Sequence, residues 1–138
     1  MRIVSRTARS LREKQREKSM RKREAAGALA TAFPRVESVR VHLQFVSNDG
    51  PPLSPRTHAL YASAQAFFEF SCPRGDCDAS IDLNDAALAL LRNGDAEASG
   101  TLYCSGTRTG DGVARRHCNQ RVDYWIVARY RPVTRAAS

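Results

Sequence analysis

Four cysteines limit the folds that this chain can adopt: Cys72, Cys77, Cys104 and Cys118. The first two flank the turn sequence Pro-Arg-Gly-Asp, whose proline and glycine allow two thiols to approach one another. Structural zinc takes four ligands in a tetrahedron and accepts thiolates at all four positions. The four residues between the first pair are more than the two found in most zinc knuckles. We nevertheless expect all four cysteines to form one Zn²⁺ site.

Two disulfides, or free thiols, are the alternative interpretations of these cysteines. The N-terminal sequence is basic and continues into more charge, so it does not read as a secretory signal. No apolar run approaches the ~18 residues of a membrane span. We therefore expect a cytoplasmic location, where cysteine clusters bind metal more often than they form disulfides. His117 is a lesser candidate ligand, because it directly precedes Cys118 and neighbours rarely both reach one metal.

The positive charge of the chain is concentrated at its N-terminus. Of the net charge of +8, residues 1–24 carry +7, from ten Lys or Arg and three Glu. Such a segment attracts phosphates or acidic protein surfaces. We therefore predict three parts: a basic helical arm at 1–24, a zinc-stabilised domain at 25–131 and a flexible tail at 132–138.

Two helices are expected from the periodicity of the apolar residues. Residues 6–33 read as one helix that becomes amphipathic at Ala25 and is ended by Pro34. Its charged first part has almost no apolar face, so removing residues 1–24 should leave the domain folded. A second helix is expected from Asp85 to Arg92, and it is closed by a glycine. We expect Asn84 or Asp82 to cap its N-terminus.

Four strands are expected as well. Residues 39–45 alternate between apolar and polar without interruption, which predicts the first strand. A Pro/Ser/Gly loop is expected at residues 47–57. The other strands are expected within 64–71, at 97–104 and at 120–130. These elements favour an α+β fold with a small, mostly antiparallel sheet. The zinc site would lie at the strand ends, with one packed helix and a long basic N-terminal helix.

Arginines surround the cysteines in the sequence. Several lie in the glycine-rich segment between Cys104 and Cys118, where they could contact phosphate or simply balance the charge of the thiolates. We assign nucleic-acid contacts to the arm and to these arginines. The assigned residues are Arg12, Lys14, Arg16, Lys18, Arg21, Lys22, Arg23, Arg74, Arg108, Arg115, Arg116 and Arg121.

These features predict a non-enzymatic binding module. The expected partner is RNA or a ribonucleoprotein such as the ribosome, with DNA second, and no membrane or small-molecule substrate is expected. The arm lacks aromatic residues that could stack on bases, which favours recognition of the backbone or of shape. The alternative is a protein–protein adaptor or regulator, for example of the transcription machinery. Its arm would dock on an acidic surface, and a Tyr124/Trp125 face would contact the partner.

An enzyme is not expected. A zinc enzyme needs an open metal position, and four cysteines would fill them all. A catalytic cysteine would need a paired base, and no histidine of the chain lies in a recognisable motif.

The segment Phe70-Ser-Cys-Pro-Arg-Gly-Asp-Cys-Asp78, followed by Asp82-Leu83, Cys104-Ser-Gly106 and Cys118, resembles a group of small bacterial four-cysteine proteins. Those proteins have a basic helix that ends in Phe-Pro, which Phe33-Pro34 matches here. The resemblance extends from about residue 10 to about residue 130, and it implies that all four cysteines form one site. The group has no established activity, so the resemblance implies no function.

Overall fold

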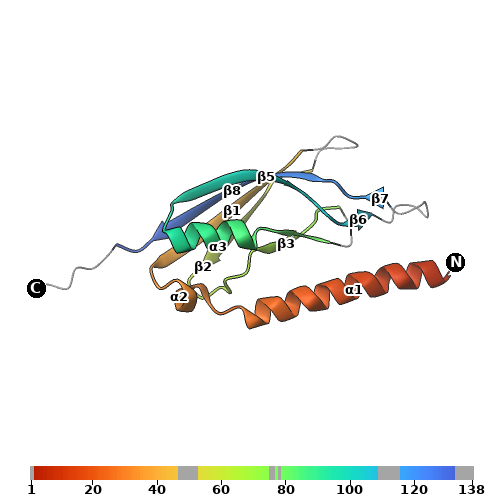
Figure 1. The fold of residues 1–138 in the computed structure, drawn as a ribbon, viewed down its shortest axis with the longest axis horizontal. Coiled ribbons are helices and arrows are strands. Elements are labelled where there is room, and N and C mark those ends of the chain that lie inside the picture. Colours follow the sequence, from red (N-terminus) through yellow and green to blue (C-terminus); the bar gives the residue numbers. More distant parts are fainter. Residues whose placement is uncertain (1, 47–52, 75–76, 78, 109–115, 133–138) are drawn as a thin grey trace, which may run out of the picture.

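The computed structural model describes residues 2–46, 53–74, 77, 79–108 and 116–132, and gives the backbone alone for 2–12, 15, 107, 108 and 116. It has an α+β fold with a four-stranded antiparallel sheet of order β2-β1-β8-β5 (Figure 1). The strands are β1 (Val36–Val46), β2 (Arg56–Tyr61), β5 (Glu97–Tyr103) and β8 (Arg121–Tyr130). The predicted α+β class and the mostly antiparallel sheet are confirmed. The predicted flexible tail, apart from residue 132, lies outside the described residues.

Smaller elements complete the fold. There are two small two-stranded sheets among the described residues. In one, β3 (Glu69–Ser71) pairs with β4 (Ser80–Asp82), and in the other, β6 (Thr107–Arg108) pairs with β7 (Arg116–His117). The helices are α1 (Arg2–Ala25), α2 (Leu29–Ala32) and α3 (Asn84–Asn93). No helix among the described residues combines the length and the apolar character needed to cross a membrane.

The core lies between one face of the main sheet and the helices. All three helices lie on the same side of this sheet (Figure 1). The opposite face carries the alternating exposed residues of each strand, because successive side chains of a strand point to opposite sides. The buried apolar residues of the core are Leu29, Val36, Val39, Val41, Leu43, Phe45, Phe68, Ile81, Leu83, Ala87, Leu90, Leu91, Val122, Ile126 and Ala128.

The single helix predicted over 6–33 is interrupted after Ala25 and forms two helices. Helix α1 ends at Ala25, and the chain turns before the short helix α2 begins at Leu29. The intervening backbone bonds to a distant segment, since Gly27 accepts from the amide of Ala66 and the amide of Leu29 donates to Ala64. These long-range hydrogen bonds replace the helical ones, so the helix ends well before Pro34.

Strand β2 was not predicted. The loop predicted at residues 47–57 overlaps its first two residues, and no element was assigned to the rest. Its sequence Arg-Thr-His-Ala-Leu-Tyr holds a single large aliphatic residue, Leu60. Backbone pairing with β1 nevertheless places Leu60 opposite Val39 and His58 opposite Val41. Tertiary pairing therefore decides a strand that the local pattern only weakly indicates.

Helix α3 follows its prediction closely, with one correction at its start. Its predicted C-cap Gly94 has the left-handed conformation, with φ of 68°. Neither predicted residue is the N-cap: Leu83 holds that position, and Asn84 is the first helical residue. Asp82 accepts the Asn84 backbone amide at 2.9 Å, while the Asn84 side chain accepts the amide of Phe68 at 2.8 Å. Asn84 therefore fastens the helix to the segment preceding β3.

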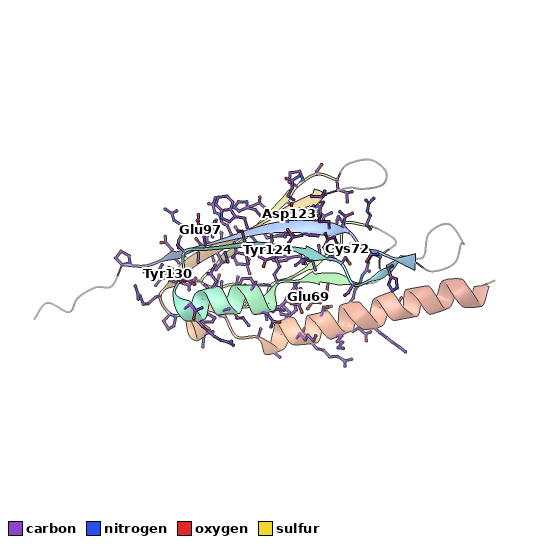
Figure 2. The ribbon with its side chains drawn as sticks, turned by 45° about the horizontal axis from the view of Figure 1, so that its top comes forward. Glu69, Cys72, Glu97, Asp123, Tyr124 and Tyr130 are labelled. Carbon is purple, nitrogen blue, oxygen red and sulfur yellow. The ribbon has the colours of Figure 1, made fainter. Side chains whose placement is uncertain are left out.

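Among the side chains that the structure describes, Ser19 and Arg23 connect α1 to the body of the protein. The Ser19 hydroxyl donates to Glu69 Oε1 at 2.8 Å, and the Arg23 guanidinium lies 5.4 Å from the centre of the Phe67 ring. The same carboxylate oxygen accepts a hydrogen bond from Ser80. Figure 2 shows Glu69 between the sheet and α1. The second half of α1 thus rests on β3, a contact that the sequence did not indicate.

Candidate metal centre

The four cysteines converge on one point at an end of the main sheet. Their sulfur atoms all lie within 4.8 Å of one another, and all four thiols are free. The Cys72 and Cys118 sulfurs are 3.7 Å apart, and those of Cys77 and Cys104 are 3.5 Å apart. Four sulfurs that each lie about 2.3 Å from a tetrahedral ion would be about 3.8 Å from one another. The cluster could therefore hold a metal ion.

Strand ends position three of the four cysteines, as the sequence predicted. Cys72 directly follows β3, and Cys104 directly follows β5, the edge strand that pairs with β8. Cys118 directly follows β7 and precedes β8. The amide of Cys104 donates to Gln120, and the amide of Cys118 donates to Gly106 at 2.8 Å. The sulfurs are thus held by backbone ladders, which limits the entropy lost when a metal binds.

Backbone amides also point at three of the sulfurs. Sγ of Cys72 accepts from the amide of Arg74, Sγ of Cys77 from that of Ala79, and Sγ of Cys104 from that of Gly106. Each donor lies two residues after its cysteine. Such outer-shell bonds favour the thiolate form and orient it. The geometry therefore suits deprotonated sulfurs around a cation.

The pKa values of three of these thiols are shifted. A hydrogen bond from the Cys72 thiol lowers the pKa of Cys104 to about 5 and raises the pKa of Cys72 above its usual range. Burial raises the pKa of Cys77 to about 12. The Cys104 thiolate is thus stabilised by hydrogen bonds from the neighbouring thiols. A bound cation would displace the protons of those thiols, because metal ligands of this type are deprotonated.

Gly106 is a site residue whose role the sequence did not reveal. A Cβ atom at this position would lie 2.6 Å from the Cys77 sulfur and 2.6 Å from the Cβ of Ala79. Both distances are far below a normal contact, so only glycine fits beside the cluster. Its place two residues after Cys104 is the one signal that could have identified it.

Gly106→Ala is expected to weaken metal binding at least tenfold and to lower the free energy of unfolding by about 1–3 kcal/mol, the usual cost of overpacking. Competition with a chromogenic chelator measures the affinity, and thermal melting measures the stability. Gly27→Ala is the matched control, because nothing lies within 4 Å of a Cβ built there. Equal metal affinity in the two variants would contradict this role for Gly106.

The arginines predicted to surround the site differ in their side-chain partners and in how much of them the structure describes. Arg74 donates to the buried Gln120 at 2.9 Å, so it is held beside the cluster. Arg121 pairs with Asp123 at 3.2 Å. Hydrogen bonds from Thr101 and Arg121 hold the pKa of Asp123 below its usual value. The structure gives only the backbone of Arg108 and Arg116, which face each other across β6 and β7, and Arg115 lies outside the described residues.

Basic side chains of α1 are exposed. The exposed ones are Lys14, Arg16, Lys18, Arg21, Lys22 and Arg23, whereas only the backbone of Arg12 is described. Arg21 lies 3.8 Å from Glu17 in an exposed pair, which contributes little stability. The N-terminal end of α1 lies toward the same end of the molecule as β6 and β7 (Figure 1).

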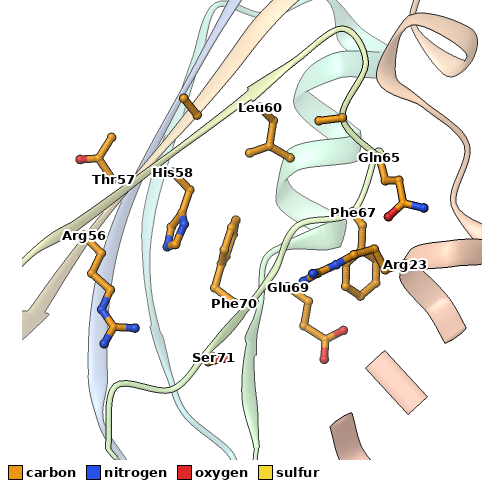
Figure 3. Close-up of a pocket in the computed structure, with 12 residues that line it drawn as sticks. Arg23, Arg56, Thr57, His58, Leu60, Gln65, Phe67, Glu69, Phe70 and Ser71 are labelled. Atoms are coloured by element: carbon orange, nitrogen blue, oxygen red, sulfur yellow. The ribbon is translucent and has the colours of Figure 1, made fainter. Parts of the chain in front are cut away.

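A separate hollow of about 560 Å³ lies where α1 meets β2 and β3 (Figure 3). The His58 ring stacks on Phe70 with centroids 4.4 Å apart, and Arg23 and Glu69 lie beyond β3. Burial, followed by the charge of Arg56, lowers the pKa of His58, so its ring stays neutral at pH 7. Within the described residues, His58 Nε2 and Glu69 Oε2 are buried without a hydrogen-bond partner.

The comparisons with known proteins return no match: no protein-family model, no curated protein and no solved structure is similar to this chain. The resemblance to small bacterial four-cysteine proteins therefore stays a prediction. His117 is exposed on β7, and the cluster contains cysteines alone among the described residues.

Proposed function

We propose that this protein is a zinc-stabilised, non-enzymatic module that binds RNA or a ribonucleoprotein such as the ribosome. Its basic N-terminal segment would act as a long helical arm along the phosphate backbone. The arginines near the metal centre would add contacts at the same end of the molecule. A cytoplasmic location fits the free thiols.

Zinc is the metal that the donor set favours. Four thiolates suit zinc or an iron–sulfur centre, and zinc accepts them in structural sites without redox chemistry. With Cys72, Cys77, Cys104 and Cys118 as ligands, the ion would have no open position for a substrate or a reactive water. Its contribution would be folding energy, because it joins the ends of β3 and β5 to the start of β8.

The exposed cations of α1 are the observation that carries the nucleic-acid proposal. Among the described residues, Lys14, Arg16, Lys18 and Lys22 have no ion-pair partner, and all four are exposed. Unpaired cations at this density exceed what solubility requires. They suit a polyanion, whose bound counterions are released when lysines and arginines replace them.

The test is a titration of the full-length protein with single-stranded RNA, structured RNA and duplex DNA at near-physiological salt. We expect tighter binding to RNA than to DNA, and an affinity that falls linearly with salt on a double-logarithmic plot. Binding no tighter than that of a simple polycation of matching charge, on all three probes, would refute the proposal. An adaptor that docks on an acidic protein surface would then be the leading alternative.

A further inference from the structure

The main sheet has one face that no described element covers. The strand register places Trp125 of β8 between His42 of β1 and Ser99 of β5 on this face. Trp125 is 47% exposed, although it stands near the middle of the sheet. The sequence suggested a joint Tyr124/Trp125 surface, but Tyr124 points to the opposite side and packs against the core. Figure 2 shows the labelled Glu97 and Asp123 on the uncovered side.

Trp125 belongs to a preformed aromatic platform. Its ring stacks on His42 with centroids 5.1 Å apart and an interplanar angle of 28°. His42 Nδ1 in turn lies 3.1 Å from the Thr57 hydroxyl, within hydrogen-bond distance. A hollow of about 370 Å³ adjoins these side chains and is also lined by Gln44 and Asp123. This volume falls in the range of about 300–1,000 Å³ that organic ligands occupy.

Most of the other exposed side chains on this face are aromatic rings or short polar groups. Tyr103 and Tyr61, at opposite ends, are 58% and 57% exposed. Between them lie small polar side chains such as Ser99 and Thr101, and the half-buried Val127 of β8; no exposed Leu, Ile or Met occurs among the described strand residues of the face. A protein-binding surface would normally have a more apolar centre. Flat rings surrounded by hydrogen-bonding groups instead suit ligands with flat faces and polar edges.

The charge of this face favours an anionic ligand. Arg40 and Arg129 are exposed on it, and Arg121 already offsets Asp123. Glu97, on the edge strand, is the remaining acid that the register places there. Cations spaced around exposed rings are the combination that single-stranded nucleic acids require, since rings stack on bases and arginines contact phosphates.

We infer that the uncovered face of the β2-β1-β8-β5 sheet binds single-stranded RNA, with one base stacked on Trp125. This inference rests on the proposed function and deepens it. The arm would supply affinity that does not depend on sequence, and the sheet would select unpaired bases. Arg40 and Arg129 would contact the phosphates beside the stacked base. Because His42 and Trp125 are already stacked, little side-chain freedom is lost on binding.

The experiment uses the intrinsic fluorescence of Trp125, which is the single tryptophan of the chain. The full-length, metal-loaded protein is titrated with an oligouridylate of about ten nucleotides, within the range of single-strand site sizes. A DNA oligothymidylate of equal length and an RNA duplex serve as parallel probes. Stacking should quench the tryptophan at saturation with the single strands and leave it nearly unchanged with the duplex. A weaker response to the oligothymidylate would assign the site to RNA.

Matched variants separate stacking from charge. Trp125→Ala should weaken single-strand binding by about tenfold, whereas Trp125→Phe should retain most of it, because either ring can stack. Arg40→Gln should weaken binding more than Arg92→Gln, which removes the same charge from an exposed position of α3 on the other side of the sheet. Melting curves and metal content establish that each variant is folded.

Each outcome decides the inference. Salt-dependent binding without quenching, or with equal affinity for Trp125→Ala and the wild type, would overturn the stacking platform and leave the proposed function standing. Equal quenching by duplex and single strands would also overturn it. Absence of binding to every probe would refute the proposed function together with this inference.

Discussion

Cys104→Ser is expected to lose its metal and the cooperative unfolding transition of the domain. Cys104 is 2% exposed and its sulfur lies within 4.8 Å of the other three, so its replacement leaves only three of the four thiols that could hold the ion. The binding free energy of structural zinc in small domains is about 10–16 kcal/mol, comparable with the whole stability of a domain of this size. Cys72→Ser is expected to behave in the same way.

Elemental analysis of protein purified under reducing conditions tests this expectation, with one zinc per chain in the wild type and none in the variant. Circular dichroism during heating reports the folded state. Ser105→Ala is the matched control, because Ser105 is the exposed neighbour of Cys104. A Cys104→Ser variant that melts like the wild type would contradict a structural role for the metal. Iron in place of zinc would overturn the assignment of the metal but not of the site.

Replacement of Lys14, Arg16 and Lys18 by Gln is expected to weaken single-stranded RNA binding about tenfold to a hundredfold at ~0.1 M salt. Each lost phosphate contact lowers the slope of log affinity against log salt by about 0.7 for single strands. Three lost contacts should therefore reduce the slope by about 2. These three residues are chosen because Ser19 and Arg23 contact the body, and their replacement would confuse docking of α1 with binding.

The control variant replaces Arg35, Arg92 and Arg131 by Gln, which removes the same charge from exposed positions of the body. Affinity is measured by fluorescence anisotropy of labelled RNA over a series of salt concentrations. Equal losses in the two variants would mean that net charge alone governs binding. The arm would then have no specific role.

Local sequence patterns predicted several elements correctly. The alternation of Val39, Val41 and Leu43 identified the central strand, and the left-handed Gly94 ends α3 where the sequence placed it. Neighbouring residues encode such features, because the period of side-chain direction and the freedom of glycine are local properties. The convergence of the cysteines could be anticipated for a chemical reason, since four thiols beside strand ends and a turn have few other uses in a reducing environment.

Contacts between distant segments could not be predicted in this way. Helix α1 ends early because the backbones of Gly27 and Leu29 form hydrogen bonds with Ala66 and Ala64. Strand β2 forms because its backbone pairs with that of β1. Gly106 is required because Cys77 approaches it from another loop. In each case the deciding partner is far along the chain, and its position is a result of folding.

Local sequence alone was enough to indicate the clustering of the four cysteines, the α+β class, the basic N-terminus and the two-sided character of the central strands. The packing of distant elements set which sheet face no described element covers, and it left Trp125 on that face, stacked on His42. The physical reason is that alternation assigns residues to opposite faces of a strand, whereas the placement of the helices decides which face is buried. The helices of this protein all lie on one side, so the other side of the sheet keeps its aromatic rings in solvent.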